Sequence, residues 1–494
     1  MVADSDAPSH NSERRSLGRI VLRNTLATTL SGGVLKVLNF LYTVYTLRVL
    51  GEAGFGQYSA VLAFVGLFGV FFEIGLAQYV QRTIAQDPAR TQALFWNLVV
   101  LRLILAIAGM AAITGLSLVL RHEPAMTFGV ALFTGTFVLA AFLMPLITVL
   151  TANERLDLVS VMEVGAQLVT IVTGVLLLHS GAGFLGLLYV GFITMPLQIV
   201  MAVWAIRRYG YGPLHFRIEP ASWRPFIRAS LPFGVTSLAL TFNFNADTVI
   251  LNLFHSNAEI GWYNAAYGLV FSLVSVAGGF LTAITPSFSR EHVSDPERVR
   301  SWTRASVRWM MLLALPAAMG VSLLASQAIQ LLYGQAFAPS GPVLAVIGWD
   351  IPLLLFCAFC GNVTAAVGLE HPAARIYLFS AALNVVLNLL LIPMYGKMAA
   401  ASITIVTDVV MAGQFFFLLA NHMQLGQIRG YLLRVAGATG FMGGAVWLAV
   451  SLPLAVPIAI GVVVYGVLAL AMRLVEPAQL AEIALKVRRR MGPA

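Results

Sequence analysis

Apolar residues recur along the chain in stretches of about 20 or more, and short polar gaps separate them. A hydrocarbon layer about 30 Å thick is crossed by about 20 residues of α-helix, so each stretch has the length of a membrane-spanning helix. We predict fourteen such helices, at residues 24–50, 53–79, 92–120, 125–150, 157–180, 183–206, 229–254, 258–288, 303–332, 340–368, 372–394, 397–420, 430–451 and 453–473. The pattern therefore indicates an all-α polytopic membrane protein.

Composition supports a lipid environment. Hydrophobic residues make up 59% of the chain and charged residues 10%, whereas an ordinary soluble domain has about 25% charged residues. The net charge of +9 comes from short basic clusters between apolar stretches, which argues against a nucleic-acid partner. Both cysteines, Cys357 and Cys360, lie inside one apolar stretch, so no disulfide framework is expected.

The positions of Lys and Arg predict the orientation, because short loops rich in these residues stay cytoplasmic. Basic residues cluster before the first helix and after every second helix, which places both termini in the cytoplasm. The first 22 residues are polar and lack the apolar core of a signal peptide, so we expect a disordered tail. The protein is expected in a bacterial inner membrane.

Two short motifs occur twice in the same order. Residues 55–60 (FGQYSA) are similar to residues 260–265 (IGWYNA), and Asp-Pro-x-Arg follows at 87–90 and again at 295–298. The repeat predicts two parallel six-helix halves, a plan found in alternating-access transporters. The expected parts are a tail at 1–23, a first half at 24–206, a cytoplasmic linker at 207–228, a second half at 229–420, two extra helices at 421–473 and a basic tail at 474–494.

Several stretches resemble the polysaccharide-transporter (Wzx-type flippase) branch of the superfamily that also holds the MATE drug antiporters and the lipid II flippases. They are residues 48–51 (RVLG) with 54–58 (GFGQY), 73–76 (EIGL), 247–251 (DTVIL), 332–339 (LYGQAFAP) and 384–396 (NVVLNLLLIPMYG). Lys397 departs from the pattern, where a small residue is expected. The resemblance implies a MATE-like fold, and a flippase that carries a lipid-linked oligosaccharide from the cytoplasmic to the periplasmic leaflet.

Charged residues inside spanning helices are costly and therefore become candidates for function. Lys36 lies near the middle of the first helix, and Asn39 and Thr43 follow it at helical spacing. This stripe is expected to face the transport cavity, where Lys36 would receive an anionic pyrophosphate or an acidic sugar. The alternative is a carboxylate partner on a neighbouring helix. Arg48 is a further candidate, although it lies close enough to a helix end to reach water.

The seventh helix carries Asn243 and Asp247 one turn apart. They are candidates for binding sugars or an ion, and the alternative is packing between helices.

Asp350 and Asp408 lie about ten residues into the tenth and twelfth predicted helices, where a desolvated carboxylate can exchange a proton. They are candidates for coupling to H⁺ or Na⁺, unless polar neighbours satisfy them as structural groups. Glu73 and Arg102 lie in the cytoplasmic halves of adjacent helices. They are expected to form a structural ion pair, with a gating role or a substrate contact as the alternatives.

No sequence motif for catalysis is convincing. The match to G-x-G-x-x-G at 181–186 joins two apolar helices, and Walker A, HExxH and metal-spaced His/Cys patterns are absent from the sequence. We expect a transporter rather than an enzyme, with no metal and no cofactor. A lipid-linked glycan, membrane lipids and other polysaccharide-assembly proteins are the expected partners. The alternatives are a multidrug or cation antiporter, a lipid II flippase, or a membrane-embedded sugar polymerase or ligase.

Overall fold

The structure is a computed structural model of the 494-residue chain. It describes every residue except 1–8, 73–75, 77–79, 81–82, 85–90, 211–215, 217, 221–222, 292–295, 424–427 and 476–494. Glu73, the whole first Asp-Pro-x-Arg motif, Asp295 of the second motif and nearly all of the basic C-terminal tail lie outside the described residues.

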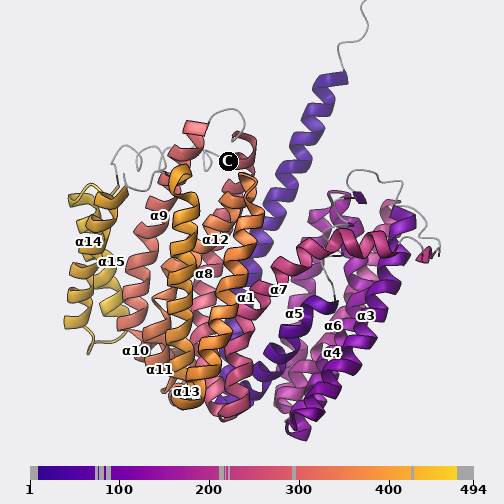
Figure 1. Cartoon of the computed structure of the whole chain (residues 1–494), viewed down its shortest axis with the longest axis horizontal. Coiled ribbons are helices and arrows are strands. Elements are labelled where there is room, and N and C mark those ends of the chain that lie inside the picture. Colours follow the sequence, from indigo (N-terminus) through magenta and orange to yellow (C-terminus); the bar gives the residue numbers. More distant parts are fainter. Residues whose placement is uncertain are drawn as a thin grey trace, which may run out of the picture. The chain divides into compact units, whose positions relative to one another are not determined.

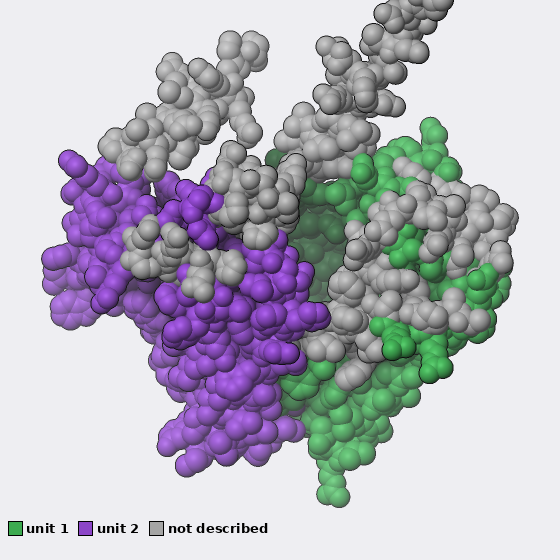
Figure 2. All heavy atoms as spheres, turned by 45° about the horizontal axis from the view of Figure 1, so that its top comes forward, with its two compact units in different colours: residues 1–249 green, residues 250–494 purple. Residues whose placement is uncertain are grey.

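The chain divides into two compact units, residues 1–249 and 250–494 (Figure 2). Unit 1 contains α1 (Ser9–Phe68), η1 (Gly69–Phe72), α3 (Thr91–Val119), α4 (Pro124–Ala152), α5 (Leu156–His179), α6 (Gly183–Tyr209) and most of α7 (Trp223–Phe254). Unit 2 contains α8 (Asn257–Glu291), α9 (Pro296–Leu323), α10 (Ala325–Tyr333), η4 (Gln335–Phe337), α11 (Ser340–Ile347), α12 (Asp350–Ala366), α13 (Glu370–Met423), α14 (Arg429–Leu448) and α15 (Ala455–Ala471) (Figure 1).

The predicted all-α membrane fold is confirmed. In the described part of the chain, seven helices are long and apolar enough to cross a membrane, or eight if α11 and α12 form one bent span. Two of the seven cover predicted spans that are joined at a glycine: α13 contains 372–394 and 397–420, and α1 contains 24–50 and the part of 53–79 up to Phe68.

Each of these two turns depends on glycine. Gly51 in α1 has φ 66° and Gly396 in α13 has φ 57°, and glycine adopts positive φ without the steric cost that other residues carry. In α13 the two limbs lie antiparallel, because Asn384 Nδ2 donates to Thr407 Oγ1 across the turn at 3.4 Å. The turn therefore forms a helical hairpin with almost no loop (Figure 1).

Two sequence expectations were wrong in detail. Residues 9–23, expected as a disordered tail, are helical and continue into α1. They contain no proline, and their Glu, Arg and Leu residues favour helix. The predicted helix at 340–368 is instead broken, with a bend of 44° between α11 and α12. Pro352 explains where α12 begins, because proline is tolerated in the first turn of a helix but not inside it.

The two extra C-terminal helices, α14 and α15, are attached to unit 2 by specific contacts. Tyr465 on α15 donates its hydroxyl proton to the carbonyl of Leu312 on α9 at 2.6 Å. Gln327 on α10 donates to the carbonyl of Val450, which lies just after α14. Met442 and Val446 of α14 pack with Leu324 in one apolar cluster.

Candidate functional site

The first limb of α1 has a polar face and an apolar face. Lys36 is half-buried, Asn39 and Thr43 are exposed, and Thr46 is buried, at spacings that place all four on one side of the helix.

Four exposed apolar side chains of the same limb, Leu30, Val34, Val37 and Leu41, form a row. With 3.6 residues per turn, this apolar row lies roughly opposite the polar row. The polar row and the exposed apolar row therefore lie on different sides of this limb. The structure therefore brings Lys36, Asn39 and Thr43 together, as the sequence indicated.

Contacts with α5 fix the rotation of this limb. The Tyr42 hydroxyl lies against Gly174 of α5, where any Cβ would collide with it. At the end of α5, the Tyr45 hydroxyl is 3.0 Å from Nδ1 of His179. These contacts set which side of α1 carries Lys36. Arg48 is exposed one turn before Gly51, at the end of the limb.

In α7, Asp247 is 2% exposed and Thr248 is 3% exposed, whereas Asn243 is half-buried. The helix is held against α1 where Asn245 packs on Gly66, with 3.1 Å between Asn245 Oδ1 and a Cβ placed at Gly66. Asn243 and Asp247 are one turn apart and therefore share a face of α7. This face gives unit 1 a second helix with polar side chains on one side.

Asp350 and Asp408 are both buried in unit 2, at 0% and 7% exposure. Asp350 is the first residue of α12, so it lies at a helix start rather than in mid-helix as predicted. The positive end of the helix dipole favours a carboxylate at this position. Both carboxylates act electrostatically on the thiol of Cys357, which places them around one point in the unit.

A chain of buried amides and hydroxyls lies next to Asp408, and the sequence reasoning did not single it out as a site. Asn388 Nδ2 donates to Asn384 Oδ1 at 2.8 Å, and Asn384 Nδ2 donates to Thr407 Oγ1 at 3.4 Å. On the second limb of α13, Thr404 Oγ1 is 3.5 Å from the Tyr263 hydroxyl of α8. A signal was present, because Asn384 and Asn388 lie one turn apart in an apolar helix.

Arg102 is buried in α3 at 5% exposure. Its predicted partner, Glu73, lies outside the described residues, so the pair stays a prediction. Within the described residues, no group of three or more His, Cys, Asp or Glu side chains is placed to hold a metal ion.

Comparison with known proteins places the chain in a family. Residues 21–292 match the family model described as polysaccharide biosynthesis protein, and this match spans more than half of the chain. The chain belongs to this family. Residues 232–390 also match the MatE model. The resemblance to the polysaccharide-transporter branch is thus confirmed.

Two relatives of this family member come from Haloferax volcanii. The chain is 22% identical over 376 residues to a probable low-salt glycan biosynthesis flippase, Agl15, covering 74% of this chain and 76% of that protein. It is 23% identical over 373 residues to a probable flippase, AglR, with the same coverage.

Solved structures show the same fold at low identity. The lipid II flippase MurJ in an inward closed conformation matches with a TM-score of 0.71 and 12% identity, covering 91% of this chain and 98% of that chain. An inward-facing multidrug-resistance MATE transporter matches with a TM-score of 0.63 and 13% identity, covering 80% and 96%. The MATE-like fold expected from the sequence is therefore confirmed.

Proposed function

We propose that this protein is a flippase that moves a lipid-linked oligosaccharide from the cytoplasmic to the periplasmic leaflet by alternating access. The observation that carries the proposal is the polar row of α1, where Lys36 lies inside a helix long and apolar enough to span a membrane, on the side opposite the exposed apolar row. The family match and the two relatives described as probable flippases support a transporter rather than an enzyme.

Lys36 would hold the anionic head of the substrate during transit. An ammonium group inside a membrane costs a few kcal/mol by insertion measurements, so it is retained where it meets an anion or a polar cavity. Asn39 and Thr43 on the same row, Arg48 at its end, and Asn243 with Asp247 on α7 would supply hydrogen-bonding groups for the sugars. The lipid tail would remain in the bilayer, so the polar head is the part that needs this path.

We further propose that Asp350 and Asp408 couple transport to a gradient of H⁺ or Na⁺. Their burial supports this, because a buried carboxylate is less stable in its charged form and can therefore take up a proton or bind a cation. The Asn384–Thr407 chain beside Asp408 offers oxygen atoms that could accept a cation.

The proposed location is the bacterial inner membrane with both termini in the cytoplasm, following the distribution of Lys and Arg. Other polysaccharide-assembly proteins would supply and use the lipid-linked glycan.

The test is export of glycan in a deletion strain that carries each variant. Lys36→Ala and Lys36→Gln should reduce export at least about tenfold at normal membrane abundance, because the charge that holds the anion is lost. Lys36→Arg should keep part of the activity, because the charge remains. The matched control is Val37→Ala, the next residue, which lies in the exposed apolar row and should export normally.

Full export by Lys36→Ala at normal abundance would contradict the proposed role of Lys36. Normal glycan export in the deletion strain itself, together with increased sensitivity to cationic drugs, would instead identify a multidrug antiporter.

A further inference from the structure

Four exposed arginines lie at one end of unit 1. Arg207 and Arg208 occupy the last turn of α6, and Arg224 and Arg228 lie in the first two turns of α7. We name these four residues the basic collar. Among the residues that the structure describes, none of the four has an ion-pair partner. Their charge is therefore available to groups outside the protein.

The two helix ends that carry the basic collar are held in place by α3. Asn97 is 3% exposed, and its Oδ1 accepts hydrogen bonds from the Glu219 backbone N–H and from Trp223 Nε1, both at 2.8 Å. Ile206 of α6 and Trp223 of α7 contribute to the same apolar cluster. The four exposed arginines are thus carried by helix ends that pack on α3.

Exposed aromatic side chains surround the basic collar. Trp204 is 61% exposed, Tyr209 is 45% exposed and Phe216 is 69% exposed. The Phe216 ring packs against Trp96 with 5.0 Å between ring centroids, which fixes its position. Trp and Tyr side chains are enriched at the headgroup level of a membrane, because one part of each ring is apolar and another part is polar. They indicate that the basic collar lies at headgroup depth.

Nearby acidic groups do not neutralise the basic collar. Asp157 is engaged by Arg155, with 3.0 Å between its Oδ1 and Arg155 Nε, and the Arg155 guanidinium lies 3.8 Å from the centre of the Tyr209 ring. The Arg155–Asp157 pair has no net charge, so it does not offset the positive charge of the basic collar. Glu219 adds one negative charge against the four arginines.

We propose that the basic collar binds the headgroups of anionic phospholipids. A phosphodiester accepts paired hydrogen bonds from a guanidinium, which favours arginine over lysine for this contact. Basic clusters directly beyond a spanning helix attract anionic lipid with about 1 kcal/mol per residue. The alternative is that the arginines only keep this end of the helices on one side of the membrane. For that role the arginines would need no fixed arrangement. The Asn97 hydrogen bonds and the flanking aromatic rings do give the basic collar a fixed arrangement, which favours binding of a headgroup.

The test uses the purified full-length protein in nanodiscs or detergent, with binding of phosphatidylglycerol and phosphatidylethanolamine followed by native mass spectrometry. The collar variant carries Arg207→Gln, Arg208→Gln, Arg224→Gln and Arg228→Gln. The control variant loses the same charge at four other exposed arginines, through Arg121→Gln, Arg375→Gln, Arg429→Gln and Arg473→Gln. Wild type and control should bind phosphatidylglycerol at least about tenfold more tightly than the collar variant, a difference of about 1.4 kcal/mol. Phosphatidylethanolamine binding should be equal in all three.

Three results would overturn the proposal. They are unchanged phosphatidylglycerol binding by the collar variant, an equal loss in the control variant, and tighter binding of inorganic pyrophosphate than of phosphatidylglycerol at the basic collar. If the collar variant fails to fold, Arg207→Gln with Arg208→Gln at the end of α6 replaces it, with an expected loss of about threefold, or about 0.65 kcal/mol. Binding is measured without transport, so this test can fail while the flippase proposal stands.

Discussion

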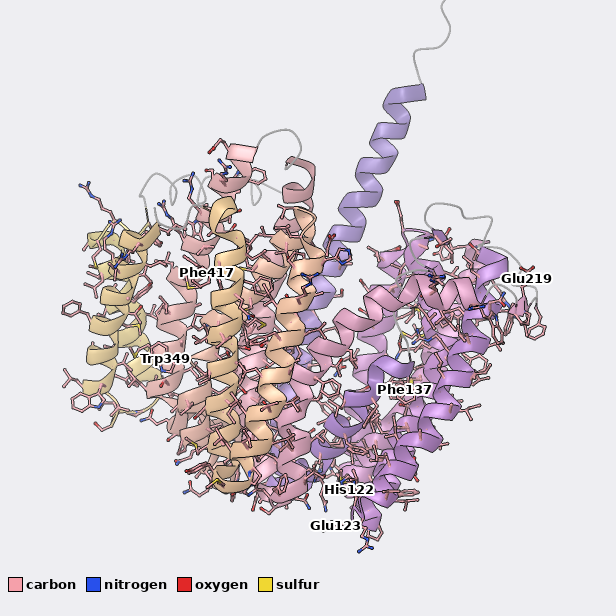
Figure 3. The ribbon with its side chains drawn as sticks, viewed as in Figure 1. His122, Glu123, Phe137, Glu219, Trp349 and Phe417 are labelled. Atoms are coloured by element: carbon pink, nitrogen blue, oxygen red, sulfur yellow. The ribbon has the colours of Figure 1, made fainter. Side chains whose placement is uncertain are left out.

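At the residue scale, the turn between α3 and α4 contains a histidine that is packed rather than free. His122 Nδ1 is 3.1 Å from Ser117 Oγ, which is itself 3.1 Å from Thr127 Oγ1 (Figure 3). The ring lies edge-on to Phe64 with 5.1 Å between centroids. Burial lowers the pKa of His122 below its ordinary value near 6.5. The folded protein therefore favours the neutral imidazole.

This lowered pKa predicts a loss of stability in acid. Since the folded-state pKa is below the unfolded one, the contribution to stability is complete above about pH 6.5 and is lost as the pH falls from there through the lowered pKa. Between pH 7.5 and 5, the unfolding temperature of the purified wild type should fall by about 2 °C more than that of His122→Gln. The control is His371→Gln at the exposed start of α13, which should follow the wild type. An equal fall in wild type and His122→Gln would show that His122 is not responsible.

At the element scale, the turn in α13 is fixed by side chains from the first turns of α8. Glu259 Oε1 is 3.6 Å from Lys397 Nζ, and Glu259 Oε2 accepts the Lys397 backbone N–H at 3.4 Å. A Cβ at Gly396 would lie 2.5 Å from the same carboxylate. The Lys397 ammonium also lies 4.7 Å from the centre of the Trp262 ring. Lys397, which departs from the family pattern, therefore has a structural explanation.

A double-mutant cycle tests this contact. Glu259→Gln and Lys397→Met should each destabilise the protein, and the double variant should lose less than the sum, with a coupling of about 1 kcal/mol because both side chains are mostly buried. High salt should weaken the coupling. The control cycle is Glu297 with Arg300 on α9, an ion pair in which Glu297 is 70% exposed, where the coupling should be at most about 0.5 kcal/mol. Equal coupling in the two cycles would contradict a special role for the Glu259–Lys397 contact.

The helices were predictable, because the length and apolar composition of each stretch of sequence determine whether that stretch can form a spanning helix. The polar row of α1 followed in the same way, from the spacing of Lys36, Asn39 and Thr43. The contact of Glu259 with Lys397 was not predictable, since it joins residues 138 positions apart whose pairing depends on how the helices pack. The same holds for the convergence of Asp350 and Asp408 on Cys357.

At the scale of the whole molecule, the distribution of basic residues predicts which ends of the helices face the cytoplasm. The basic collar places four arginines where α6 ends and α7 begins. The turns near Arg121, Gly181, His255 and Gly396 at the other helix ends are short and hold two basic residues with permanent charge, Arg121 and Lys397. Because Lys and Arg in short loops resist translocation, the basic ends should be cytoplasmic. An even number of spans then places both termini on the same side.

Reporter fusions test this orientation. Fusions after Gly181, Ser256 and Gly396 should report the periplasm, through active alkaline phosphatase and inactive green fluorescent protein, and fusions after Gln86, Tyr211 and Asp295 should report the reverse. Two predicted spans, 183–206 and 229–254, lie between Gly181 and Ser256. The fusions at these two positions must therefore report the same side of the membrane. A cytoplasmic signal at Gly181 with a periplasmic signal at Ser256 would require an odd number of crossings between them. It would contradict the two parallel six-helix halves, because the second half would then begin on the opposite side of the membrane from the first.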